Sequence, residues 1–164
     1  KQIADAMEQM AAVKTGALIV VEQEVGLGEY EQTGIAVDGI VTSQLLINIF
    51  EKNTPLHDGA VIIRDNRVVS ATCYLPLSDN MNISKAMGTR HRAALGLSEV
   101  SDAKIFVVSE ETGAMSMAQG GKITREIDRD FILNQFQYKE GQEKKTSALR
   151  RRILLRKSKG GKKK

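Results

Sequence analysis

Residues 89–92 form a cluster of hydrogen-bond donors that suits a phosphate group. Thr89 is predicted to cap a helix that runs to about Glu99, and the unpaired N–H groups at a helix start favour an anion. Arg90 and Arg92 add planar guanidinium groups, which bind phosphate through paired hydrogen bonds. Because they are two residues apart on a helix, they point in different directions. We expect one to face the site and the other to serve a neighbouring carboxylate or a partner chain, while a solvated helix start stays open as the alternative.

A second cluster, His57-Asp58-Gly59, precedes a predicted strand. Glycine lets a ligand approach the backbone closely, and an imidazole and a carboxylate stand beside it. An Asp-Gly pair is also common in turns. On these three residues alone, a turn with an exposed histidine is the better interpretation.

A third cluster reads Ser-Glu-Glu-Thr-Gly at residues 109–113 and follows another predicted strand. Open α/β sheets bind their ligands at such strand ends. Paired carboxylates there would suit Mg²⁺ or Mn²⁺, which prefer oxygen ligands. A solvated acidic turn is the alternative.

The sequence also excludes several kinds of site. It contains no Gly-rich phosphate loop ending in Gly-Lys-Ser/Thr, no Cys-x-x-Cys pair for zinc and no Gly-x-Ser-x-Gly nucleophile motif. Cys73 is the one cysteine, which excludes an internal disulfide, and its strand-like surroundings predict a small buried side chain. Aromatic residues make up 4% of the chain, too few for a surface on which bases stack.

The net charge of +4 is divided unevenly along the chain. Residues 1–138 contain 12 Lys or Arg and 18 Asp or Glu, whereas residues 139–164 contain 12 and 2. The body is therefore acidic, which argues against nucleic-acid binding by the body and leaves the tail as a separate question.

Hydrophobic spacing predicts helices and strands that alternate in the first half of the chain, with hairpins between them. Helices are expected at residues 2–14, 42–50, 84–87, 89–99 and from 128 onward, strands at 17–23, 35–37, 60–64, 67–75, 104–109, 114–119 and 122–127, and a glycine-punctuated loop at 24–34. Asp65-Asn66 and Gly120-Gly121 are the expected hairpin turns. The fold class is therefore α/β, with a mixed central β-sheet of about six or seven strands surrounded by helices. It forms a single domain over residues 1–138, followed by a basic flexible tail over residues 139–164.

The three clusters in this order resemble the diadenylate cyclase domain family of bacteria. Pro-Leu-His-Asp-Gly-Ala-Val-Ile at residues 55–62 and Gly-Thr-Arg-His-Arg-Ala-Ala at residues 88–94 are its signatures, and Ser-Glu-Glu-Thr-Gly at 109–113 follows. The similarity runs from about Gly16 to about Ile127. Residues 41–46 and 73–77 resemble the membrane-anchored form of the family, whose transmembrane helices precede the catalytic domain and are not in this sequence.

The resemblance implies a nucleotidyltransferase that condenses two ATP molecules into cyclic di-AMP. Each subunit of a homodimer binds one ATP, and the two subunits meet face to face in the active state. The 3′-hydroxyl of each ATP attacks the α-phosphate of the other, and two pyrophosphates leave.

The resemblance also implies a role for individual residues. The catalytic residues would be Asp58, Gly59, Arg90, His91 and Arg92. The residues that contact ATP would be Leu18, Asp58, Gly59, Tyr74, Leu75, Gly88, Thr89, Arg90, Ser109 and Glu110. The metal ion, Mg²⁺ or Mn²⁺ with Co²⁺ as a further candidate, would be held by His57, Asp58 and Glu111. Asp58 would lie beside the attacking hydroxyl as a metal ligand, a base or both.

For the full-length protein, the resemblance implies the cytoplasmic face of the bacterial membrane, reached through the missing helices. The sequence as given has no apolar run of membrane length and is expected to be a soluble fragment. Its basic tail suits anionic lipid or solvent, and no specific nucleic-acid partner is expected because 26 residues are too few for a folded DNA-binding domain. Two other classes remain open: a catalytically idle nucleotide sensor and a nucleic-acid-binding module driven by the tail.

Overall fold

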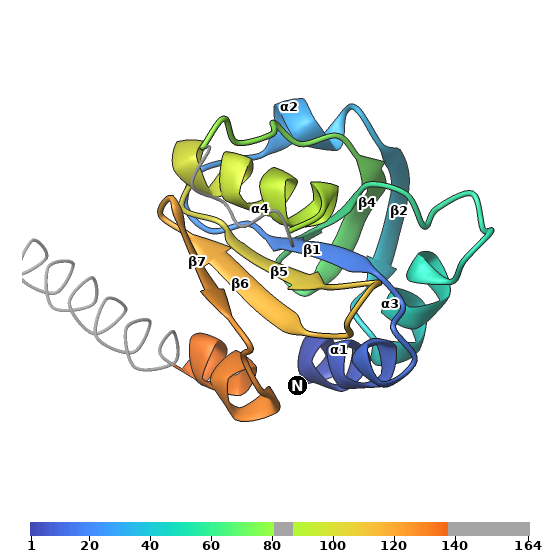
Figure 1. The fold of residues 1–164 in the computed structure, drawn as a ribbon. Helices are drawn as coiled ribbons and strands as arrows, with labels where there is room; N and C mark the ends of the chain where they lie inside the picture. The colour runs from blue at the N-terminus through green and yellow to red at the C-terminus, as the bar shows by residue number, and fades with distance from the viewer. Residues whose placement is uncertain (81–86, 138–164) are drawn as a thin grey trace, which may run out of the picture. The chain divides into compact units, whose positions relative to one another are not determined.

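A computed structural model describes residues 1–80 and 87–137 of the chain, in which seven strands form one mixed sheet (Figure 1). The strands are β1 (Ala17–Val21), β2 (Ile35–Ile40), β3 (Ala60–Arg64), β4 (Arg67–Cys73), β5 (Lys104–Val108), β6 (Met115–Gln119) and β7 (Lys122–Arg125), in the order β2-β4-β3-β1-β5-β6-β7. The predicted α/β fold with six or seven strands is confirmed.

Strand β1 lies in the middle of the sheet, parallel to β3 on one side and antiparallel to β5 on the other. Its sequence, Ala-Leu-Ile-Val-Val, has no polar residue because side chains on both faces of the strand are covered. Leu18 and Val20 belong to one core cluster with Leu97 of the helix α4 (Thr89–Val100). Every other strand pair of the sheet is antiparallel.

Helices cover both faces of the sheet (Figure 1). Helix α4 packs on one face, while α1 (Gln2–Ala12) and α3 (Ser43–Phe50) lie together on the other. In α1, Ile3, Met7 and Met10 are buried at helical spacing. Helix α3 starts as expected, because the Thr42 side chain accepts a hydrogen bond from the N–H of Leu45 at 3.1 Å.

Both predicted hairpin turns are confirmed. Asp65 and Asn66 join β3 to β4, with φ angles of 46° and 64°. Gly120 and Gly121 join β6 to β7, with φ angles of 57° and 72°. Two successive residues with positive φ match the twist of a tight hairpin, and Asp, Asn and Gly adopt that conformation at low cost.

The predicted loop at residues 24–34 is only partly a loop, because it contains a short helix, α2 (Gly28–Glu31). The carboxylate of Glu22 accepts a hydrogen bond from the N–H of Leu27, and Asp102 accepts one each from the N–H groups of Glu24 and Val25. These long-range contacts fix the segment, and its local composition did not indicate them.

By its internal contacts the chain forms two compact units, Lys1–Arg129 and Asp130–Lys164. Residues 130–137 of the second unit are helical, consistent with the helix expected from Asp128 onward. Most of the helical turn expected at 84–87, and the basic tail at 139–164, lie outside the described residues.

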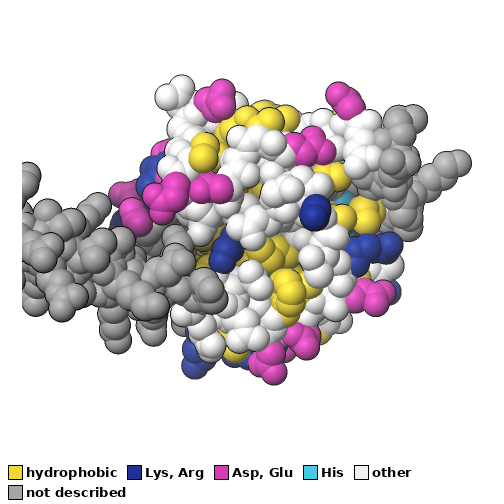
Figure 2. Space-filling model, turned by 90° about the vertical axis from the view of Figure 1, so that its left-hand side faces the viewer, with side chains coloured by type: hydrophobic (Ala, Val, Ile, Leu, Met, Phe, Trp, Pro, Cys, Tyr) yellow, Lys and Arg dark blue, Asp and Glu magenta, His cyan; other side chains and the backbone are white. Residues whose placement is uncertain are grey.

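Among residues 1–80 and 87–137, no helix is both long enough and apolar enough to cross a bilayer. Figure 2 shows one side of the molecule, where acidic and basic side chains alternate with small hydrophobic areas.

Candidate active site

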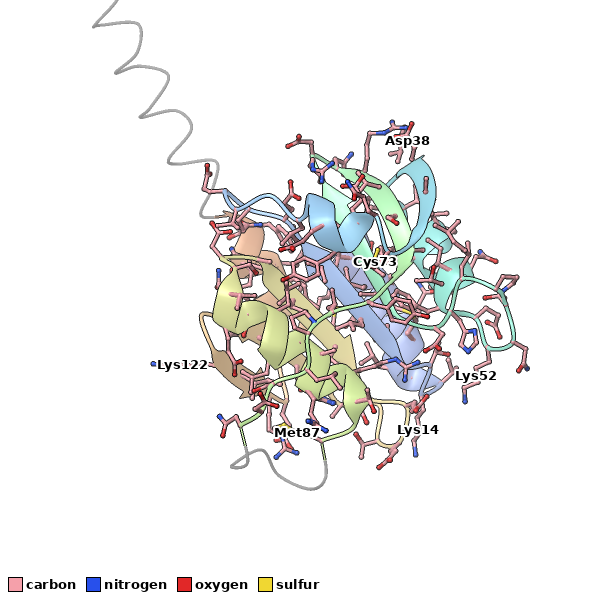
Figure 3. All side chains as sticks on the ribbon, turned by 90° about the horizontal axis from the view of Figure 1, so that it is seen from above. Lys14, Asp38, Lys52, Cys73, Met87 and Lys122 are labelled. Atoms are coloured by element: carbon pink, nitrogen blue, oxygen red, sulfur yellow. The ribbon has the colours of Figure 1, made fainter. Side chains whose placement is uncertain are left out.

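One pocket of about 670 Å³ gathers residues from five places in the chain. It is lined by Leu18, His57, Asp58, Gly59, Cys73, Tyr74, Leu75, Leu77, Gly88, Thr89, Arg90, His91, Ala93, Val108, Ser109, Glu110 and Glu111. In Figure 3, Lys14, Lys52 and Met87, which precede three of these segments, lie in the lower half of the view. The pocket therefore forms where β1, β4, β5, α4 and the segment before β3 converge.

The structure places the first turn of α4 in this pocket, as expected for a phosphate site, but it corrects the cap. Gly88 is the N-cap residue, with extended backbone, and Thr89 is already the first residue of the helix. Within residues 1–80 and 87–137, no side-chain hydrogen bond caps this end of α4. The Thr89 hydroxyl is therefore not used as a cap, and the positive end of the helix dipole lies at the pocket wall.

Arg90 is the arginine that faces the pocket. Its Nη1 lies 3.0 Å from Oε2 of Glu110, in the turn after β5. Its Nε is buried and has no hydrogen-bond partner among the described residues. An arginine held by one exposed carboxylate keeps several donors for a bound anion.

Arg92 does not line the pocket. Its side chain is exposed, and Nη2 donates a hydrogen bond to the carbonyl oxygen of Ser78 at 3.2 Å. The N–H of Ser78 donates in return to the carbonyl of Arg92 at 3.0 Å. The expectation that the two arginines diverge is confirmed, but Arg92 serves a backbone carbonyl rather than a carboxylate.

His57 and Asp58, in the segment before β3, line the same pocket as Arg90. The Nδ1 atom of His57 lies 2.6 Å from the carbonyl oxygen of Thr54, which accepts only from a protonated nitrogen. Nε2 of the neutral imidazole is thus left with its lone pair, the arrangement found in metal-binding histidines. Asp58 is exposed and lines the pocket with it.

Gly59 is required by the fold as well as by the pocket. Its φ is +89°, and a Cβ atom at this position would lie 2.9 Å from the carbonyl carbon of Thr72 in β4. Any side chain would therefore push β3 and β4 apart where both end at the pocket. From the sequence alone, the close approach of a ligand to the backbone was the expected reason for glycine at this position.

The turn after β5 is held by Ser109. Its Oγ accepts hydrogen bonds from the N–H groups of Glu111 and Thr112, each at 3.3 Å. This turn brings Glu110 and Glu111 to the pocket with both side chains exposed.

The end of β4 forms the remaining wall. The Tyr74 side chain is 74% exposed, and the N–H of Tyr74 donates a hydrogen bond to Oγ1 of Thr33 at 2.9 Å. Cys73 is buried, as predicted, and burial raises the pKa of its thiol. An uncharged thiol at this wall is a poor nucleophile.

His91 lies on the inner side of α4 and is buried. Burial lowers the pKa of its imidazole, and the nearby charge of Arg125 on β7 lowers it further. Both effects favour the neutral imidazole, so His91 does not add a second cation beside Arg90 near pH 7.

The residues at this site suit a metal ion that is only partly held by protein. In the described part of the chain, no three His, Cys, Asp or Glu side chains lie close enough together to hold a metal ion. His57 and Asp58 line the same wall, while Glu111 comes from the turn after β5. One or two protein ligands, completed by phosphate oxygens and water, are the usual environment of Mg²⁺.

All the residues expected at the site line one pocket, with the exception of Arg92. Sequence reasoning missed Leu77, Ala93 and Val108, which contribute apolar area. It also missed Gly16, which lies against Arg90. The position of Gly16 directly before a buried strand was the available signal.

Comparison with known proteins identifies the family. A family model described as "DisA bacterial checkpoint controller nucleotide-binding" matches residues 4–123. The cyclic di-AMP synthase CdaA of Bacillus subtilis is 51% identical over 130 residues, which are 79% of this chain and 48% of that protein. The chain thus spans about half the length of this curated relative.

Solved structures agree with this match. The crystal structure of DacA from Staphylococcus aureus, a double mutant, superposes with a TM-score of 0.78 at 50% identity, over 80% of this chain and 87% of that one. A protein of Bacillus cereus described as hypothetical and membrane spanning has a TM-score of 0.74 at 47% identity, over 77% and 62% of the two chains. The chain belongs to the family of DisA bacterial checkpoint controller nucleotide-binding domains.

Proposed function

We propose that this chain is the catalytic domain of a diadenylate cyclase, which condenses two ATP molecules into cyclic di-AMP and releases two pyrophosphates. The observation that carries the proposal is the pocket in which Asp58 and His57 line one wall and the start of α4, with Arg90, lines another. Its volume of about 670 Å³ is within the range of small-molecule sites, about 300 to 1,000 Å³. The curated relative named above as a cyclic di-AMP synthase supports the same activity.

The proposed reaction forms a bond between the 3′-oxygen of one ATP and the α-phosphorus of the other. The bond from that phosphorus to the β-phosphate bridging oxygen breaks, and pyrophosphate leaves with its electron pair. Asp58 takes the proton of the attacking hydroxyl or holds the metal ion beside it. The same reaction between the 3′-oxygen of the second ATP and the α-phosphorus of the first closes the ring and releases the second pyrophosphate.

The phosphates would be bound by the first turn of α4 and by Arg90, because backbone N–H groups and a guanidinium both donate to anions. Thr89, Ser109 and Glu110 border the same space. The adenine would lie between Leu18 and the Tyr74-Leu75 segment, where the pocket is most apolar. Nucleotidyl transfer depends mainly on such positioning and on charge neutralisation.

We assign a divalent metal ion, Mg²⁺, Mn²⁺ or Co²⁺, to His57 and Asp58, with phosphate oxygens and water as its remaining ligands in place of the Glu111 expected from the resemblance. When bound, the ion would neutralise phosphate charge and activate the attacking oxygen. The hydrogen bond from His57 to Thr54 supports this assignment, since it leaves Nε2 available. The Asp58 carboxylate supplies an oxygen ligand of the kind that these ions prefer.

The active species would be a homodimer in which two pockets face each other, because one pocket of this size holds one ATP. In the full-length protein, transmembrane helices before this domain would place it on the cytoplasmic face of the membrane. The relative described as membrane spanning supports that location. The basic tail suits anionic lipid, and we propose no specific nucleic-acid partner.

A product assay tests the proposal directly. The purified chain is incubated with ATP and Mg²⁺, Mn²⁺ or Co²⁺ in turn, and the nucleotides are separated by chromatography. We expect cyclic di-AMP with two pyrophosphates for each molecule formed, and no product in excess chelator. Nucleotide binding without product under all three metals would instead support an idle sensor. Salt-sensitive DNA binding that is lost on removal of residues 139–164 would support the nucleic-acid module.

A further inference from the structure

Gly16, the residue before β1, is buried directly beneath the guanidinium of Arg90. A Cβ atom at this position would lie 2.8 Å from Nη1 of Arg90, 3.0 Å from its Cζ and 3.0 Å from Cβ of Glu110. Nonbonded carbon and nitrogen atoms do not approach so closely without a displacement. The absence of a side chain at Gly16 thus provides the space that the Arg90 side chain occupies.

The backbone conformation does not explain this glycine. Gly59, Gly113, Gly120 and Gly121 have positive φ angles, and Gly16 is not among them. Alanine at this position is therefore free of backbone strain. The contacts of Gly16 with the side chains of Arg90 and Glu110 are what would resist a larger residue.

The contact of Gly16 with Arg90 differs from the close contacts of other buried glycines. A Cβ at Gly34 or Gly96 would meet backbone oxygen atoms, which cannot move without distorting the sheet or α4. At Gly16 it would meet the mobile end of one side chain and the Cβ of Glu110. An added methyl group would therefore displace the Arg90 guanidinium and press on the turn after β5 through Cβ of Glu110, while its three nearest atoms include none of the sheet backbone.

Arg90 has few other restraints. Its one ion pair is with Glu110, which is 55% exposed, and its Nε lacks a partner among the described residues. Within the described residues, no other ion pair or side-chain hydrogen bond fixes the direction of the guanidinium. We propose that Gly16 is a positioning residue. Because it has no side chain, the Arg90 guanidinium can lie against it and so points toward the phosphates of the bound nucleotide. This inference rests on the proposed function of the pocket.

The test compares Gly16→Ala with Gly26→Ala, because a Cβ at Gly26 meets nothing within 4 Å and the substitution is the same. The ligand is 3′-deoxy-ATP, which lacks the attacking hydroxyl, and binding is measured by calorimetry in Mg²⁺. We expect Gly16→Ala to raise the Kd by about 10- to 100-fold, the range for losing hydrogen bonds to a charged group. We expect Gly26→Ala to bind like the unmodified chain, and the melting temperatures of both variants to stay close to its value.

A double-mutant cycle separates positioning from a general structural effect. Arg90→Lys removes both terminal nitrogens, including the atom nearest to a Cβ at position 16, so in that background the methyl group of Gly16→Ala meets Cβ of Glu110 and an ammonium that has no planar fork to misdirect. We expect Gly16→Ala to change the Kd of Arg90→Lys by less than about twofold. If Gly16→Ala alone unfolds the chain, the Arg90→Lys substitution should restore folding.

Three outcomes would overturn the inference: equal binding by Gly16→Ala and Gly26→Ala, an equal loss in both Arg90 backgrounds, or unfolding that Arg90→Lys does not reverse. The proposed function fails on a different result, the absence of cyclic di-AMP when the unmodified chain is given ATP and metal. An unmodified chain that binds no 3′-deoxy-ATP would refute both the role of Gly16 and the proposed function of the pocket.

Discussion

Asp58 is an exposed carboxylate in a pocket that is also lined by the start of α4 and by Arg90. Donors at the start of α4 and on Arg90 attract a nucleotide in its ground state, whereas a carboxylate repels phosphate. Its contribution is therefore expected at the chemical step, as a base or a metal ligand, and not in the binding of ATP.

We predict that Asp58→Asn lowers turnover by about 100- to 10,000-fold, the usual contribution of a general base, and leaves the affinity for 3′-deoxy-ATP within a few-fold. Turnover by chromatography and affinity by calorimetry provide the comparison. Asp38→Asn is the matched control, because Asp38 lies far from the pocket side in Figure 3 and tolerates asparagine at its φ of 50°. Normal turnover by Asp58→Asn would refute the assigned role.

At the scale of elements, residues 22–34 connect the ion pairs of Arg64 to the end of β4, which lines the pocket. Glu22 binds Arg64 through Nε at 2.6 Å and Nη2 at 3.0 Å, and Arg64 also binds Glu31. At the far end of this segment, Thr33 accepts the hydrogen bond of the Tyr74 N–H. The ion pairs at the base of α2 thereby support a wall of the pocket.

The hydrogen bonds from Arg64 lower the pKa of Glu22 below its ordinary value of 4.5. A carboxyl group with a lowered pKa in the folded state stabilises the fold above the unfolded pKa, and this contribution is lost as pH falls through the folded pKa. We predict that Glu22→Gln costs about 2 kcal/mol at pH 7 and progressively less below pH 4.5.

Urea unfolding at several pH values measures this difference, with Glu24→Gln as the control, since the Glu24 side chain is exposed. A loss that is the same at pH 7 and at low pH would show that the charge of Glu22 contributes nothing.

Local signals were sufficient for the elements and insufficient for their arrangement. Asp65-Asn66 and Gly120-Gly121 specify hairpins because few residues adopt the required φ angles, and Thr42 caps α3 through its own hydroxyl. Helix α2 was missed because Asp102, which is 77 and 78 residues away from its partners, fixes the segment before it. The order of strands in the sheet depends on similar distant contacts.

The same limit applies to the site. The resemblance selected the residues that line the pocket, and helical geometry predicted that Arg90 and Arg92 diverge. Neither indicated which of the two arginines enters the pocket. That depends on a distant contact, the hydrogen bonds between Ser78 and Arg92, which hold the Arg92 side chain away from the pocket. The contact between Gly16 and Arg90 joins the residue before β1 to α4; the sequence marks Gly16 by its place before a buried strand but does not indicate Arg90 as its neighbour.

At the scale of the whole molecule, the proposed product, cyclic di-AMP, would constrain the assembly. One chain contains a single copy of each cluster, whereas cyclic di-AMP contains two equivalent phosphodiester bonds. A symmetric product made from equivalent substrates requires equivalent sites, which a two-fold dimer supplies.

We predict that specific activity at saturating ATP rises with protein concentration when the chain is mainly monomeric at rest. An excess of Asp58→Asn chain should then suppress the unmodified chain by forming inactive heterodimers. A dilution series with and without the variant, combined with sedimentation, measures both effects. Specific activity that stays constant while only monomers sediment during turnover would exclude the face-to-face mechanism.

Strand β1 occupies the middle of the sheet but comes first among the strands in the sequence. Its partners β3 and β5 begin 43 and 87 residues after Ala17. A ribosome therefore releases Ala-Leu-Ile-Val-Val long before either neighbour exists to cover it, and such uncovered apolar strands invite aggregation. Because Leu18 also lines the pocket, the nucleotide site is completed only after β5 has been made and β1 is enclosed between β3 and β5. ATP would then bind only chains whose synthesis has passed Glu111, the last residue of the pocket lining.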